Sequence, residues 1–136
     1  MGAWDASVFG NDDAADWGGD LADGDSEMPV HEVLREVAGW AADEYLESSL
    51  GSEALAAAEV VAAAAGRPTT VNAYNENVLA WATKRPSLAE LAPVARNAVE
   101  RVRAAESELA EEWEEAGDAN RAAWSEAVEN LLTRLI

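Results

Sequence analysis

The spacing of apolar residues along the chain predicts α-helices. After Pro29, apolar side chains recur at every third or fourth position and would share one helix face: Val30, Val33, Leu34, Val37, Ala41 and Tyr45. Pro29 suits the first turn of this helix, whose end we expect near Glu47. No segment alternates apolar and polar residues in the way that a half-buried strand does.

Residues 53–65, EALAAAEVVAAAA, are apolar on nearly every side. A helix without a polar face is usually buried, because none of its sides favours water. We therefore expect a central helix that Ser52 caps and that follows a break at residues 48–51.

Shorter helices are expected before and after this central one. Asn11 can cap a helix that ends near Leu21, and Val78, Leu79 and Trp81 fall in a short helix. Residues 87–90, SLAE, form a capping-box pattern ahead of a helical period that Pro93 either kinks or divides in two.

Two helical segments follow toward the end of the chain. Ser107 can cap a turn that carries Leu109 and Trp113. The apolar side of the closing helix comprises Trp124, Ala127, Val128, Leu131 and Leu135. The total is about six helices in one all-α domain, residues 1–136. Residues 1–27 form an acidic, aromatic arm with the first short helix, and residues 28–136 form the helical body.

The charge narrows the classes of partner. Asp and Glu number 27 against nine Lys and Arg, a net charge of −18. Nucleic acids and anionic membranes are expected to be excluded, because binding them needs cations. The sign favours a basic protein partner or a metal cation, although surplus acid also keeps proteins dissolved. We find no spanning segment and no signal peptide, so we expect a cytoplasmic protein.

The arm combines acids with aromatic rings. The first 27 residues hold eight carboxylates and no Lys or Arg, together with Trp4, Phe9 and Trp17. Disordered acidic tails are poor in aromatic residues, so we expect Trp4 and Phe9 to pack the arm on the body. Asn11, Asp12 and Asp16 are expected to pin the arm, with Asp12 accepting hydrogen bonds from the amides of residues 3–9.

Four acids of the first helix suggest a metal site: Asp12, Asp13, Asp16 and Asp20. On a helix, Asp13, Asp16 and Asp20 would share one face and repel one another, unless a cation such as Mg²⁺ or Ca²⁺ lay among them. The alternative is structural, because acids in a first turn also stabilise the helix dipole.

Glu59 stands alone among apolar residues of the central helix. A buried carboxylate must be paired, hydrogen-bonded or protonated. One interpretation is a structural anchor bound to a Trp N–H, a backbone amide or an arginine, for which Arg35, Arg67 and Arg96 are candidates. The other is a general acid or base with a raised pKa.

A possible partner surface lies near the end of the chain, where Glu111, Glu112, Glu114 and Glu115 flank Trp113. An exposed Trp in a ring of acids would suit a basic partner. The apolar spacing of Leu109 and Trp113 favours the alternative, in which Trp113 faces the core.

Three blocks of the chain resemble a known family. GAWDASVFGNDDAADW at the start, YLESSLGSEALAAAEVVAA at 45–63 and SELAEEWEE at 107–115 are similar to a bacterial family known as domain of unknown function 4259. Family openings usually carry Gly and often Pro between Trp and Phe, where this chain has Asp5-Ala6-Ser7-Val8. The resemblance implies a small cytoplasmic bacterial protein and brings no activity, substrate or catalytic residue.

Three functions therefore stay open. We find no phosphate loop, nucleophile elbow or dinucleotide fingerprint, so the leading hypothesis is a non-enzymatic interaction or regulatory, immunity-like module that binds a basic partner. The second is a metal-binding protein or metal-dependent hydrolase that uses the N-terminal Asp residues. The third is a structural homo-oligomer with a large apolar surface patch. No cofactor other than Mg²⁺ or Ca²⁺ is expected, and the pattern does not define an oligomeric state.

Overall fold

The structure is a computed structural model that describes residues 5–136. Its helices, in chain order, are α1 (Asp12–Asp23), α2 (Met28–Ala38), α3 (Ser48–Ala64), α4 (Glu76–Thr83), the 3₁₀ helix η1 (Pro86–Leu91), α5 (Ala92–Arg103), α6 (Glu108–Glu115) and α7 (Asp118–Arg134). Among these residues no strand forms, so the prediction of an all-α domain is confirmed. Seven α-helices form where about six were expected.

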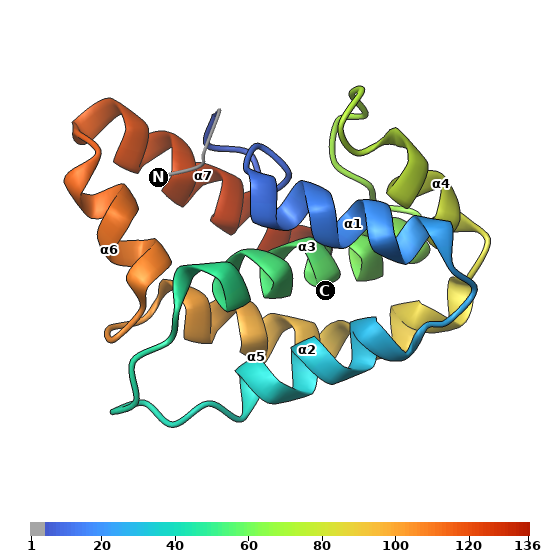
Figure 1. The fold of residues 1–136 in the computed structure, drawn as a ribbon, viewed down its shortest axis with the longest axis horizontal. Coiled ribbons are helices and arrows are strands. Elements are labelled where there is room, and N and C mark those ends of the chain that lie inside the picture. The colour runs from blue at the N-terminus through green and yellow to red at the C-terminus, as the bar shows by residue number, and fades with distance from the viewer. Residues whose placement is uncertain (1–4) are drawn as a thin grey trace.

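The helix α3 lies at the centre of the molecule, with α1 on one side and α2 and α5 on the other (Figure 1). Every residue from Ala54 to Ala64 is buried. Alanine side chains are small, so neighbouring helices can approach α3 closely from several sides. The prediction of a buried central helix is therefore confirmed.

The start of α3 differs from the prediction. The helix begins at Ser48, so residues 48–51 form its first turn and Ser52 does not cap it. Gly51 packs against Val102 and Leu109, where an added Cβ would lie 3.5 Å from Val102 Cγ1. The glycine therefore marks a close helix contact, and local sequence alone does not distinguish that role from a helix break.

The end of α2 also differs. The helix stops at Ala38, and residues 40–47 form a loop, although the apolar period continued to Tyr45. Tyr45 is exposed and does not lie on a buried face. Contacts made by this loop with a distant arginine, described below, replace the helix that the spacing predicted.

Other helix boundaries support most of the sequence patterns. Asn11 caps α1 by accepting a hydrogen bond from the Ala14 amide at 2.9 Å, and Ser107 caps α6. Pro93 lies in the first turn of α5, so the chain forms two successive helices there. The capping box at 87–90 is wrong, because Ser87 lies inside η1 and makes no cap. A 3₁₀ helix has a tighter turn, which removes the spacing that a capping box needs.

The core gathers the apolar faces of all these helices. Phe9 is 2% exposed and packs at the edge of α1, beside Gly18 and Val78. Trp4 lies outside the described residues, so packing of the complete arm stays a prediction.

None of the helices in the described part of the chain has the length and apolar character needed to cross a membrane.

Candidate functional site

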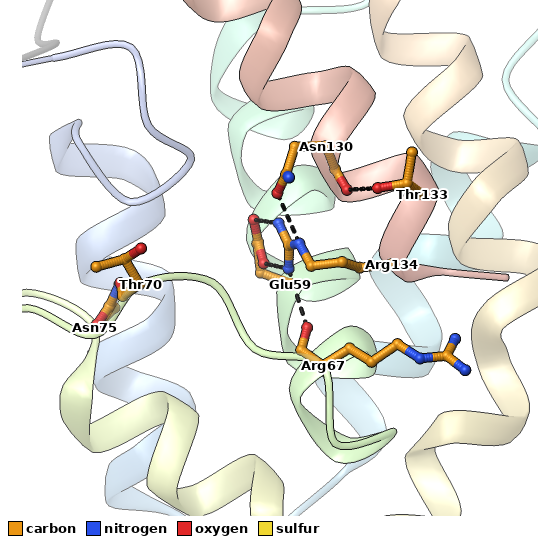
Figure 2. A network of polar contacts seen from close by, with 7 residues as sticks. All are labelled: Glu59, Arg67, Thr70, Asn75, Asn130, Thr133 and Arg134. Carbon is orange, nitrogen blue, oxygen red and sulfur yellow. Dashed lines mark hydrogen bonds and ion pairs between the residues drawn. The ribbon is translucent and has the colours of Figure 1, made fainter.

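Glu59 forms a buried ion pair with Arg134 (Figure 2). Its Oε1 accepts from Nη1 of Arg134 at 2.7 Å, and its Oε2 accepts from Nη2 at 2.9 Å. The expected partners Arg35, Arg67 and Arg96 are therefore wrong as side chains, although the Arg67 carbonyl accepts from Nη1 of Arg134 at 3.2 Å. The partner is on α7 because the end of that helix packs on α3, an arrangement that local spacing does not reveal.

The rest of the Arg134 guanidinium is also bound. Nε donates to Oδ1 of Asn130, one turn earlier on α7, at 2.8 Å. Fork-to-fork pairs of this kind have both carboxylate oxygens engaged by one cation. The geometry favours the structural anchor over general acid–base catalysis for Glu59, because its charge is directed at Arg134 and away from solvent.

The four predicted metal-binding acids, Asp12, Asp13, Asp16 and Asp20, all lie exposed on α1. Among residues 5–136, no three His, Cys, Asp or Glu side chains gather closely enough to hold a metal ion. The metal site at these acids stays a prediction.

The turn before α1 is held by Asp5, which was not expected to hold it, and by Asn11, which was. Asp5 accepts hydrogen bonds from the amide and hydroxyl of Ser7, and Nδ2 of Asn11 donates to the Val8 carbonyl at 3.2 Å. Within the described residues, Asp12 and Asp16 make no side-chain hydrogen bond. Asn11 therefore both caps α1 and holds the turn, whereas a pinning role for Asp12 and Asp16 stays a prediction.

The charges of two carboxylates on neighbouring helices act on a third carboxylate, Glu53. Partial burial raises the pKa of Glu53 on α3, and the charges of Asp13 on α1 and Glu36 on α2 raise it further. We call Asp13, Glu36 and Glu53 the three-helix acidic face. Within the described residues, no Lys or Arg forms an ion pair with any of the three, so the repulsion on Glu53 is not offset by a side-chain cation.

Trp113 is buried, with 5% of its surface exposed. Its ring stacks on Trp124 of α7, with centroids 6.4 Å apart and planes 8° from parallel. The prediction of a partner surface around an exposed Trp113 is therefore wrong, and the core-facing alternative holds. Burial removes both apolar rings from water, and the stacked contact between them adds further stabilisation.

The glutamates around Trp113 have separate surroundings. Glu111, Glu114 and Glu115 are exposed, and Glu112 is half-buried. Oε1 of Glu114 pairs with Arg121 at 3.0 Å. Oε1 of Glu111 accepts from the Tyr45 hydroxyl at 2.8 Å, a contact across 66 residues of sequence.

Arg101 is a buried cation that the sequence patterns did not single out. It lies on the apolar side of α5, is 8% exposed, and donates to backbone carbonyls only. The acceptors are Trp40 at 3.3 Å, Ala41 at 3.1 Å, Glu44 at 2.7 Å, Ala105 at 3.1 Å and Glu106 at 3.3 Å. An arginine on an apolar helix face was the available signal, but carbonyl acceptors have no sequence signature.

The two segments that Arg101 holds also pair with each other. The Leu46 amide donates to the Glu106 carbonyl at 2.9 Å, and the Glu108 amide donates to the Leu46 carbonyl at 2.9 Å. Oε1 of Glu108 accepts from the Ser48 amide at 2.8 Å, so a residue of α6 caps the start of α3. This arrangement brings the chain blocks at 45–63 and 107–115 side by side.

A groove runs between α5 and α7 and has a volume of about 670 Å³. Within it, Arg103 is paired with both Glu100, at 2.7 Å, and Glu129. Those pairs neutralise the cation, and none of the predicted site residues lines this groove.

Comparison with family models identifies the protein family of the chain. A model described as "Domain of unknown function (DUF4259)" matches residues 2–127. The chain belongs to the DUF4259 family. Neither curated proteins nor solved structures give a match. The DUF4259 match includes Arg101 and both segments that it holds, whereas Arg134 lies beyond the matched range.

Proposed function

We propose that this DUF4259 protein is a non-enzymatic interaction or regulatory module whose acidic surface binds a basic protein partner. The observation that supports the proposal is the three-helix acidic face, where partial burial raises the pKa of Glu53 and the charges of Asp13 and Glu36 raise it further. Like charges held together destabilise a fold, so their presence needs a reason beyond folding. A basic partner would supply the missing counter-charge.

The distribution of charge along the chain supports the same proposal. Residues 5–53 hold fourteen acids and a single base, Arg35. Within the described structure only one of these acids forms an ion pair, Asp25 with Arg85 at 3.8 Å. The remaining ion pairs lie on α3 and α5–α7, so the unpaired negative charge concentrates on the first part of the chain.

The other two functions gain no such support. The metal-binding alternative would need the α1 carboxylates to converge, and they lie exposed along the helix. The homo-oligomer would need a large apolar patch, whereas the exposed large apolar side chains lie in four segments: Met28, Tyr45, Val71 with Tyr74, and Ile136.

Capture experiments with matched charge variants test the proposal. The test variant is Asp13→Asn with Glu36→Gln and Glu53→Gln, and the control is Glu90→Gln with Glu115→Gln and Glu126→Gln, which changes the net charge equally. We expect wild type and control to retain the same basic protein from a lysate of the source cells, and the test variant to lose it. Equal loss in both variants, or no basic protein retained by wild type, would leave solubility as the role of the charge.

A further inference from the structure

An exposed tyrosine lies beside one of the glutamates that flank the buried Trp113. Tyr45 is 45% exposed, and its hydroxyl donates to Glu111, one of the glutamates beside the buried Trp113. Glu106 and Glu108 lie near enough for their charges to act on the same phenol. We call Tyr45, Glu106, Glu108 and Glu111 the Tyr45 platform.

The platform is rigid although Tyr45 lies in a loop. Arg101 binds the carbonyls of Ala41 and Glu44 in this loop and the carbonyls of Ala105 and Glu106 in the turn before α6. The paired Leu46 and Glu108 backbones fix the next residues, and this loop lies beside the turn before α6 in Figure 1. A surface held before binding loses little conformational entropy when a partner docks.

The chemistry of the platform fits an arginine. A guanidinium group stacks on an aromatic face and donates several hydrogen bonds to carboxylates, whereas an ammonium group lacks the planar fork. The Tyr45 hydroxyl uses one oxygen of Glu111, and within the described residues the other oxygen has no hydrogen bond. The platform therefore offers a ring and free carboxylate oxygens together.

The molecule already contains this arrangement in an intramolecular form. The Arg85 guanidinium lies 3.8 Å from the centroid of the Trp81 ring and pairs with Asp25 at 3.8 Å. At Trp81 the chain supplies its own arginine, whereas among residues 5–136 no arginine forms an ion pair with the carboxylates of the Tyr45 platform.

We propose that the Tyr45 platform receives an arginine side chain of the basic protein partner, which stacks on the Tyr45 ring and pairs with Glu111 and Glu106. The inference rests on the proposed function and adds the residue type that the partner presents. The inference is supported by charge complementarity and by the exposed, fixed ring of Tyr45.

The test is a ¹H–¹⁵N titration of the full chain with a peptide of alternating Gly and Arg, beside the matched Gly–Lys peptide. We expect Gly–Arg to bind more tightly and to shift the amides of residues 44–47 and 106–111. Tyr45→Leu should weaken Gly–Arg binding roughly five- to tenfold, as loss of a cation–π contact implies. Tyr45→Phe keeps the ring and should weaken it less.

Tyr74→Leu is the matched control, because Tyr74 is also an exposed tyrosine and lies in the loop before α4. Thermal melts establish that each variant is folded. Unchanged Gly–Arg binding in Tyr45→Leu, with binding lost in the Asp13, Glu36 and Glu53 variant, would overturn this inference and leave the proposed function standing. Failure of both peptides to bind, with no basic protein captured, would overturn both proposals.

Discussion

Glu59 and Arg134 join the buried central helix to the last turn of α7 through two hydrogen bonds, across 75 residues of sequence. The carboxylate lies where water cannot replace its partner, since the Glu59 side chain is 3% exposed. The pair also fixes the segment after α3, because Arg134 donates to the Arg67 carbonyl. Three parts of the chain thus meet at one guanidinium.

Removing the charge of Glu59 should destabilise the protein strongly. We expect Glu59→Gln to lower the free energy of unfolding by about 3 kcal/mol, because Arg134 is left without its counter-charge. Urea denaturation at neutral pH measures this loss. The control is Glu126→Gln, an exposed glutamate on α7, which should change stability little. An unchanged unfolding midpoint in Glu59→Gln would rule out an ionised pair.

Arg101→Lys should loosen the loop between α2 and α3. Lysine keeps the charge but cannot reach carbonyls on two segments at once, so we expect a loss of about 2 kcal/mol. Hydrogen exchange at the Leu46 and Glu108 amides should accelerate together. Arg103→Lys changes an exposed arginine on the same helix and should cost less than about 1 kcal/mol. Equal protection of both amides in wild type and Arg101→Lys would contradict the role assigned to Arg101.

The consecutive glycines of α1 should respond differently to the same substitution. A Cβ at Gly18 would lie 3.2 Å from Cε1 of Phe9, whereas nothing lies within 4 Å of a Cβ at Gly19. We expect Gly18→Val to cost about 2 kcal/mol through overpacking. Gly19→Val should change stability by less than about 0.5 kcal/mol. Thermal melts compare the two, and similar losses would show that Phe9 does not pack on α1 in solution.

The Tyr45 hydroxyl should lose its proton at a higher pH than an ordinary tyrosine does. Its hydrogen bond to Glu111 and the nearby glutamates raise the pKa of Tyr45 from 10.0 to about 12. The neutral phenol is favoured in the folded protein, so its stabilisation is complete below pH 10 and is lost as the pH rises through 12. Ultraviolet absorbance of phenolate follows the titration, with Tyr45→Phe identifying the signal. Glu111→Gln should bring the Tyr45 transition back toward pH 10.

Glu53→Gln should stabilise the protein slightly at neutral pH. Burial and repulsion from Asp13 and Glu36 raise the pKa of Glu53, so the folded state holds its proton more tightly than the unfolded chain. The ionised form is therefore unfavourable above the folded pKa, and the gain should disappear in acid. Solvent screening keeps the gain below about 1 kcal/mol. Melts at neutral and acidic pH, in low and high salt, measure it.

Patterns of local spacing were enough to place most helices. Apolar periodicity identified α2, α4 and α7, and the absence of any polar side identified α3 as buried. Asn11 and Ser107 were found as caps because a cap depends on residues within one turn. The family resemblance came from the same local blocks and is confirmed by the match to residues 2–127.

The candidate sites depended on contacts that spacing does not contain. The apolar spacing placed Tyr45 on a buried helix face and favoured burial of Trp113, and only the tertiary structure exposes Tyr45 and brings its hydroxyl to Glu111. Arg101 binds carbonyls of the loop that follows α2, and because every residue has a carbonyl, no residue type reveals these contacts.

The sequence by itself determined the helical class, the burial of α3 and the excess of negative charge, because each follows from residue type and short-range period. The tertiary structure decided that Glu59 binds Arg134, that Arg101 holds the loop of Tyr45, and that the charges of Asp13 and Glu36 act on Glu53. These relationships join helices far apart in the chain, and their energies depend on distance in space, which local sequence does not encode.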